Sequence, residues 1–242
     1  MKTFHGEWNI DEYIRNTFFP DYSYRGVFVE VGAAGPEFLS MSLHFRENGW
    51  RVIGIEPNPE FCKLHREKGY EVLQYACGDR DEDNVEFFVV DSQGAAYSGG
   101  KVSYESFSSL GLKSSYAGLK KDINQRKIIV QLRRLDTILE THAPDVRQID
   151  ILSIDVEGWE LEVIDGLNTT KYRPRLMIVE NLFNSNKYLS YKRARGYWLW
   201  KRASPNDVYV RKDTVAGFLQ RLWLDLYGAA VYLKNCARQD TK

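Results

Sequence analysis

Residues 27–37 read VFVEVGAAGPE, and this stretch decides the fold. Its first five residues favour a buried strand, the next four form a glycine-containing turn, and the residues from Glu37 onward have the spacing of a helix. Small residues in such a turn let the backbone approach a ligand closely, and a helix that begins there offers free N–H groups. We therefore expect ligand binding from Glu30, Gly32, Ala33 and Gly35.

The same strand-then-helix pattern recurs along the chain. Further β-rich runs occupy residues 51–56, 71–76, 149–155 and 175–180, and the helices expected between strands occupy residues 37–48, 59–68 and 157–166. Strands that alternate with helices predict a parallel sheet in an α/β fold. Near the end, GYWLWKR and DVYVRK alternate in polarity around residues 203–206, which predicts an antiparallel hairpin at the sheet edge.

A nucleoside cofactor is indicated by Glu56, which with Pro57 ends the second strand 24 residues after Gly32. A carboxylate at that place can accept hydrogen bonds from both hydroxyls of a ribose. Asp79, after the third strand, either lies near the adenine or begins a turn in the acidic run 79–83.

The type of cofactor follows from the turn itself. A dinucleotide fingerprint, G-x-G-x-x-G, requires glycine where Ala34 stands. Glu30 suits a cofactor that carries an amino acid, because an ammonium group needs an anionic neighbour. S-adenosylmethionine meets this description, and NAD does not.

Carboxylates also follow the strands at 149–155 and 175–180. Asp155 and Glu157 come directly after the first of these, and Glu180 ends the second. Ligands of open α/β sheets bind outside the carboxyl ends of the strands, so these three acids are expected at one mouth. They are candidates for a general base or for a divalent cation site with oxygen ligands. Alternatively, Glu157 and Glu180 have structural roles: Glu157 complements the charge of a helix N-terminus, and Glu180 makes a hydrogen bond to a neighbouring loop. Glu160 and Glu162 lie further into the predicted helix and are expected to be solvated.

Length and composition bound the remaining possibilities. A chain of 242 residues with 43% hydrophobic and 27% charged residues suits one large domain with extensions. Three cysteines without a CxxC pair predict neither a disulfide framework nor a zinc site. Charges interrupt the N-terminus early and no long apolar run follows, so we expect a cytoplasmic protein without a transmembrane segment.

Charge is divided unevenly along the chain. Residues 1–170 hold 18 basic and 28 acidic side chains, whereas residues 171–242 hold 15 and 5. The basic segment 187–212 is either an anion-attracting rim over a site or a solvated face that complements the acidic half.

Two segments lie outside the alternating pattern. Residues 92–119 contain 13 Gly or Ser among 28 positions, interleaved with aromatic side chains, and form either a substrate lid or a plain surface loop. The tail from Thr214 to Lys234 has an apolar helical stripe, typical of a helix that packs on the core, lies on a membrane surface or forms a dimer.

With these motifs identified, the chain resembles the FkbM family of S-adenosylmethionine-dependent methyltransferases over about residues 25–212. The blocks that carry the resemblance are VFVEVGAAGPEFLS, VIGIEPNPEFCKLH, LRRLDTILE, RPRLMIVEN and, most diagnostic, IDILSIDVEGWELEVIDGL. The family's usual VDVGANxG differs here at Glu30, in place of Asp, and at Ala34, in place of Asn. Ser106, Ser108 and Ser109 resemble the family's SSL segment, which implies a place near the cofactor or the acceptor.

The resemblance implies a doubly wound, mostly parallel, seven-stranded Rossmann-like methyltransferase sheet with a reversed final hairpin. We then expect an N-terminal helical extension over 1–25, the methyltransferase domain over 26–212 with a lid insertion at 92–126, and a C-terminal helix over 213–242. The activity implied is O-methylation of a sugar, glycan or natural-product hydroxyl.

Asp155 is the expected base because it ends a rigid central strand, with Glu157 and Glu180 as alternates. The expected partner is a small-molecule or glycan acceptor, and a nucleic acid is not expected at zero net charge. Two alternatives stay open: an RNA or nucleotide methyltransferase on the same fold, suggested by the basic and aromatic stretch 188–202, and a non-catalytic cofactor-binding module.

Overall fold

The computed structural model describes residues 3–90, 96–97, 102–103, 108–111, 125–214 and 219. Most of the insertion 92–126 and of the tail 213–242 therefore lies outside the described residues, and the lid and the C-terminal helix stay predictions. Among the helices in the described part of the chain, none combines the length and the apolar character needed to cross a bilayer.

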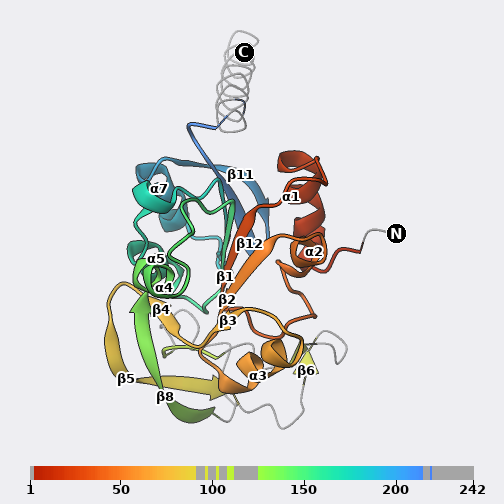
Figure 1. Cartoon of the computed structure of the whole chain (residues 1–242). Helices are drawn as coiled ribbons and strands as arrows, with labels where there is room; N and C mark the ends of the chain where they lie inside the picture. The colour runs from red at the N-terminus through yellow and green to blue at the C-terminus, as the bar shows by residue number, and fades with distance from the viewer. Residues whose placement is uncertain are drawn as a thin grey trace, which may run out of the picture.

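The main sheet has seven strands in the order β11-β12-β10-β9-β1-β2-β3 (Figure 1). Its parallel strands are β1 (Val27–Val31), β2 (Arg51–Ile55), β3 (Val72–Leu73), β9 (Ile151–Ile154) and β10 (Leu176–Glu180). The last two strands, β11 (Tyr197–Ala203) and β12 (Asn206–Arg211), form an antiparallel hairpin, and β12 pairs antiparallel with β10. The predicted mostly parallel sheet with a reversed final hairpin is confirmed.

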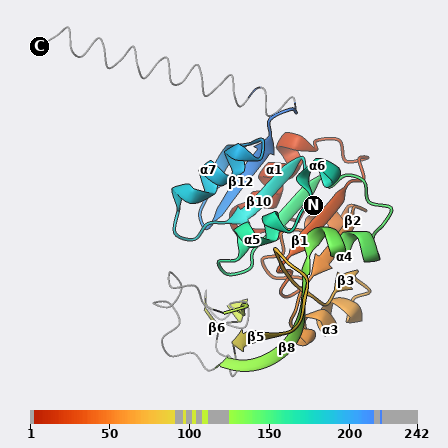
Figure 2. The ribbon, with the colours of Figure 1, turned by 90° about the vertical axis from the view of Figure 1, so that its left-hand side faces the viewer.

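Helices cover both faces of this sheet (Figures 1 and 2). Alternate strand residues point to opposite faces, so that Leu152 packs with α4 (Leu135–His142) and α5 (Glu160–Asp165), whereas Ile151 packs with α1 (Ile10–Phe18) and α2 (Leu43–Glu47). The other helices are η1 (Glu7–Asn9), α3 (Pro59–Glu67), α6 (Thr169–Tyr172) and α7 (Asn186–Ala194). The strands are buried on both faces and read as continuous apolar runs for this reason.

A second sheet, which the sequence patterns did not predict, lies below the main one in Figure 2. It contains β4 (Ala76–Gly78), β8 (Gln125–Arg134) and β5 (Glu82–Val90) in that order. The prediction of one strand over 71–76 is wrong, because only Val72 and Leu73 pair with β2 before the chain turns away into β4. A two-residue pair, β6 (Ala96–Tyr97) and β7 (Val102–Ser103), forms a small separate ladder.

The helix predicted over 37–48 is also wrong in its first half, because α2 begins only at Leu43. The buried Glu30 carboxylate accepts hydrogen bonds from Met41 N, at 3.2 Å, and from Ser42 Oγ, at 2.6 Å. Leu39 has φ 55°, a left-handed conformation that ends any helix. The glycine turn consequently opens into a tied loop and not into a helix N-terminus. Similarly, the helix predicted over 157–166 begins at Glu160.

Candidate active site

The glycine turn joins three strands at their carboxyl ends. Gly32 N and Ala33 N both donate to the carbonyl oxygen of Ile55, at the end of β2. Gly32 has φ 79°, and a Cβ built there would lie 1.8 Å from the carbonyl oxygen of Asp155, which follows β9. Only glycine allows the backbones of β1 and β9 to meet this closely. The turn therefore fixes Asp155 beside the β1 loop.

Glu56 is buried and held from two sides by backbone donors. Its Oε2 accepts from Ala34 N at 2.9 Å, and its Oε1 accepts from Asn58 N at 2.8 Å. Burial raises the pKa of Glu56 to about 7. Each carboxylate oxygen has a second lone pair, so the oriented side chain can still accept hydrogen bonds from a ligand. Ala34 itself has φ 42°, in the left-handed region that asparagine tolerates better than alanine.

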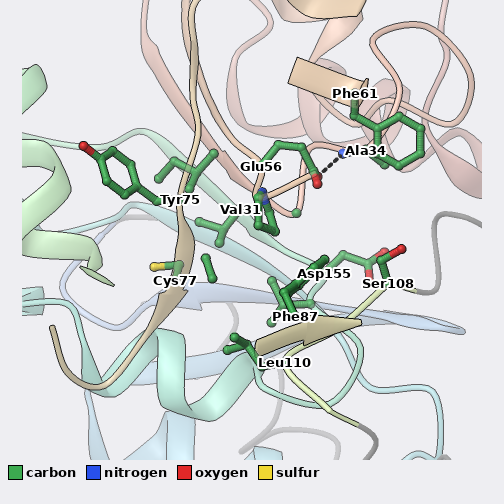
Figure 3. A pocket seen from close by; sticks show the side chains of 15 residues that line it. Val31, Ala34, Glu56, Phe61, Tyr75, Cys77, Phe87, Ser108, Leu110 and Asp155 are labelled. Carbon is green, nitrogen blue, oxygen red and sulfur yellow. Dashed lines mark hydrogen bonds between the residues drawn. The ribbon is translucent and has the colours of Figure 1, made fainter. Parts of the chain in front are cut away.

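Glu56 faces a cavity of about 510 Å³ of empty space, part of it open to solvent, which we call the inner cavity (Figure 3). Its lining is mainly apolar and comes from both sheets: Val31, Gly32, Ala34, Ile55, Glu56, Pro57, Phe61, Tyr75, Ala76, Cys77, Phe87, Ser108, Leu110, Asp155 and Val156. An apolar slot with one oriented carboxylate suits a planar base joined to a sugar with free hydroxyls.

Several lining residues of the inner cavity were missed from the sequence. Phe87 and Leu110 lie on and beside β5, a strand that no pattern had predicted. Phe61 lies in the first turns of α3, five residues after Glu56. Its place in the predicted helix was the one sequence signal that could have identified it as a lining residue. Ser108 lines the cavity and accepts a hydrogen bond from Val90 N, and Ser109 pairs with the backbone of β5. Ser106 lies outside the described residues.

Asp79 is not brought to the site. It does not line the inner cavity, and its Oδ1 accepts from Arg80 Nη1 at 3.2 Å on the surface. Because β3 ends at Leu73 and the chain crosses to the second sheet, the positions that reach the cavity are Tyr75, Ala76 and Cys77. The turn alternative for Asp79 is the one that the structure favours.

The three predicted acids of the mouth do converge. One oxygen of each of Asp155, Glu157 and Glu180 lies within 4.8 Å of the others. Glu157 and Glu180 are each 6% exposed, whereas solvent reaches Asp155. The pKa of Asp155 is raised well above its usual range. The main cause is desolvation of the carboxyl group by the surrounding protein, and the next is repulsion from Glu157 and Glu160. A carboxylate with a raised pKa is a stronger base, and the same oxygens can hold a divalent cation.

Glu160 corrects another prediction, because it is fully buried and not solvated. Its Oε1 accepts from Gly158 N at 2.8 Å, and its Oε2 accepts from Tyr188 OH at 2.6 Å. Glu157 has φ 58° in this loop. Glu160 therefore ties the loop that carries Asp155 and Glu157 to the first turn of α5 and to α7.

A second space, the outer cavity, holds about 1290 Å³ and is open to solvent. It shares Gly32, Ala34 and Asp155 with the inner cavity, so the two spaces meet there. The rest of its lining is Glu7, Trp8, Glu30, Ala33, Gly35, Phe38, Leu39, Ser40, Met41, Ser153, Glu157, Glu180, Leu182, Ser204 and Pro205. Burial raises the pKa of Glu30 to about 6, against the hydrogen bond from Ser42 and the charge of Arg46.

The basic segment 187–212 does not form a rim over the site, because none of its Lys or Arg side chains lines either cavity. Arg195 and Arg202 pair with Asp165 and Asp207. Lys192 is fully buried, with Nζ 3.9 Å from the sulfur of Met177, and burial lowers its pKa to about 7. Part of this segment is thus structural.

Comparison with known proteins gives the family. The crystal structure of methyltransferase FkbM from Methylobacillus flagellatus KT has 14% sequence identity and a TM-score of 0.47, over 83% of this chain and 50% of that chain. This chain therefore spans about half the length of that one, and no curated protein matches it. The sequence model of the methyltransferase FkbM domain matches residues 30–198, more than half of the chain. The chain therefore belongs to the FkbM methyltransferase family.

Proposed function

We propose that this methyltransferase binds S-adenosylmethionine in the inner cavity and transfers its methyl group to a hydroxyl oxygen of a sugar, glycan or natural product in the outer cavity. The observation that carries the proposal is the meeting of the two cavities at Asp155. An apolar slot with an oriented carboxylate on one side and an acidic open space on the other provides separate places for a nucleoside and an acceptor.

The residues of the inner cavity fit the cofactor. Glu56 would accept hydrogen bonds from the ribose hydroxyls, and Tyr75 and Phe87 would pack around the adenine. Where the inner cavity opens into the outer one, Gly32 and Gly35 would let the amino-acid part lie against the turn, with Glu30 of the outer cavity as the anionic neighbour of its ammonium. When bound, S-adenosylmethionine supplies a methyl group on a sulfonium whose sulfur leaves as a neutral thioether.

Asp155 is the proposed base. It lies where the cavities meet, it is accessible from the solvent, and its raised pKa makes the carboxylate a stronger base toward the proton of an acceptor hydroxyl. Glu157 and Glu180 stand beside it as the alternates. The main work of the protein is then to hold the acceptor oxygen in line with the methyl group and to exclude water.

Calorimetry with S-adenosylmethionine, S-adenosylhomocysteine and NAD tests the cofactor assignment. We expect the first two to bind and NAD not to bind. A methyl-transfer screen over glycans, natural-product hydroxyls and nucleotides, with and without chelator, then tests the reaction. Transfer to nucleotides alone would contradict the acceptor class, and activity that chelator abolishes and Mg²⁺ restores would assign the three carboxylates to a cation and not to a base.

A further inference from the structure

The outer cavity, the proposed acceptor site, has a strongly acidic lining. Five of its lining side chains are carboxylic acids, and among the described residues that line it there is no Lys, Arg or His. Glu30 is used in holding the loop at Met41 and Ser42, and Arg46 partly balances its charge. Asp155 is the proposed base. The other three acids of the lining are Glu7, Glu157 and Glu180.

The bound cofactor does not balance these acids. S-adenosylmethionine carries a sulfonium, an ammonium and a carboxylate, so it brings one net positive charge to a space with five acids. A phosphorylated or carboxylated acceptor would meet like charges in this space and be repelled. A cationic acceptor would instead be attracted.

The rim of the outer cavity adds a second, independent feature. Trp8 is 71% exposed and Phe38 is 46% exposed, and both line the cavity. Exposed aromatic faces beside carboxylates bind ammonium groups and the C–H faces of sugar rings. They come from separate segments of the chain, which the Gly6–Leu39 bridge holds together.

Glu7 is also held in place at this rim. Its Oε2 accepts a hydrogen bond from Nδ2 of Asn206, at 3.0 Å, and Asn206 is only 3% exposed at the start of β12. The contact joins residues 199 positions apart in the chain. Glu7 therefore has a fixed position in the outer cavity. Trp8, whose ring is exposed, is the next residue along the chain and also lines this cavity.

We infer that the acceptor is an amino sugar, free or within a glycan, whose ammonium group is selected by Glu7 and Trp8 while a neighbouring hydroxyl is methylated. This rests on the proposed function, and it narrows the acceptor to one class. Glu157 and Glu180 supply further acceptors for the ammonium and the ring hydroxyls.

The test uses protein saturated with S-adenosylhomocysteine and three sugars of one ring type that differ in charge: glucosamine, glucose and glucuronate. Calorimetry should show glucosamine binding at least about tenfold more tightly than glucose, and glucuronate not binding. Trp8→Ala and Glu7→Gln should each weaken glucosamine at least about fivefold without changing the affinity for S-adenosylhomocysteine. Trp8→Phe should retain most of the affinity, and the surface variant Glu140→Gln should behave as the wild type.

Equal binding of glucosamine and glucose, or binding of neither, would overturn the inference. A metal ion in the outer cavity would also overturn the inference. In that case calorimetry would show Mg²⁺ binding to the wild type but not to Glu180→Gln, and Mg²⁺ would abolish the preference for glucosamine. Failure of S-adenosylhomocysteine to bind at all would instead overturn the proposed function, which keeps the two failures distinct.

Discussion

The inner and outer cavities share Asp155, but their walls have different origins. The Glu56 side of the inner cavity comes from one continuous strand-turn unit, in which backbone donors orient the carboxylate. The outer cavity is assembled from segments near both ends of the described chain, such as Glu7 and Pro205. A cofactor site built locally can stay constant while an acceptor site built from distant segments changes. The following experiments separate the two.

The largest effect on stability and binding is expected from Gly32→Ala, because Gly32 lines both cavities. A Cβ at this position overlaps the Asp155 carbonyl oxygen at 1.8 Å, and φ 79° disfavours alanine in any case. We expect a loss of roughly 3 kcal/mol or more in the free energy of unfolding, and loss of cofactor binding. Gly35→Ala is the matched control, because a Cβ there meets no atom within 4 Å. Denaturant unfolding measures the stability of both variants. Equal stability of Gly32→Ala and Gly35→Ala would contradict the close approach of β1 and β9.

Asp155→Asn should separate chemistry from cofactor binding. Loss of a base should lower the transfer rate by roughly 10² to 10⁴ while the affinity for S-adenosylhomocysteine changes little. In the wild type the rate should fall as pH drops through the raised pKa of Asp155, and chelator should have no effect. If the variant transfers methyl groups at a near-normal rate, the base is Glu157 or Glu180, and the same substitution is then made there.

Glu56→Ala should affect the inner cavity alone. In the proposed complex it would remove two charge-assisted hydrogen bonds to the ribose, each worth about 1.5 to 3 kcal/mol, so the affinity for S-adenosylmethionine should fall at least about tenfold. The preference among acceptors should not change at saturating cofactor. Calorimetry gives the affinity, and circular dichroism checks that the fold is intact. Unchanged affinity in a folded variant would remove Glu56 from the cofactor site.

The smallest effect concerns the pH dependence of stability without ligand. Burial raises the pKa of Glu56 to about 7 and that of Glu30 to about 6, from 4.5 in the unfolded chain. The folded state therefore holds protons on these two groups at pH values where the unfolded chain has lost them. Their contribution to the free energy of unfolding is largest below pH 4.5. It falls as the pH rises from 4.5 to about 6 for Glu30 and to about 7 for Glu56, by up to about 1.4 kcal/mol for each group and each pH unit, and it levels off above those values.

Thermal unfolding across this range should show a steeper fall of the melting temperature for the wild type than for Glu56→Gln, which cannot ionise. Parallel curves would mean that the pKa of Glu56 is not raised in the folded protein.

Prediction from sequence was most successful where a residue's place depends on its own strand. Glu56 and Asp155 follow apolar runs, so their position at the carboxyl edge was predictable. It failed where distant pairing decides. Phe87 reaches the inner cavity because β5 pairs with β8, where Phe87 lies opposite Ile128, and no local pattern encodes that contact. Asp79 was misplaced because β3 of the main sheet ends at Leu73, and the strand directly before Asp79 is β4 of the second sheet.

Glu160 shows a different limit. The burial of Glu160 is made favourable by hydrogen bonds from Val156 N, Gly158 N and Tyr188 OH. The last of these donors becomes visible only when α7 is placed against the loop. The convergence of Asp155, Glu157 and Glu180 was predictable because the edge of a parallel sheet gathers the ends of its strands.

The second sheet would give the proposed cofactor a role in holding the protein together. Phe87 and Leu110, on one wall of the inner cavity, belong to the β5 side, whereas Val31 and Ile55, on another, belong to the main sheet. A nucleoside between these walls would contact both sheets and stabilise their packing, so its removal should destabilise the second sheet before the main sheet. Limited proteolysis within β5 and β8 should then report cofactor occupancy, so cellular turnover of the protein would follow the supply of its methyl donor.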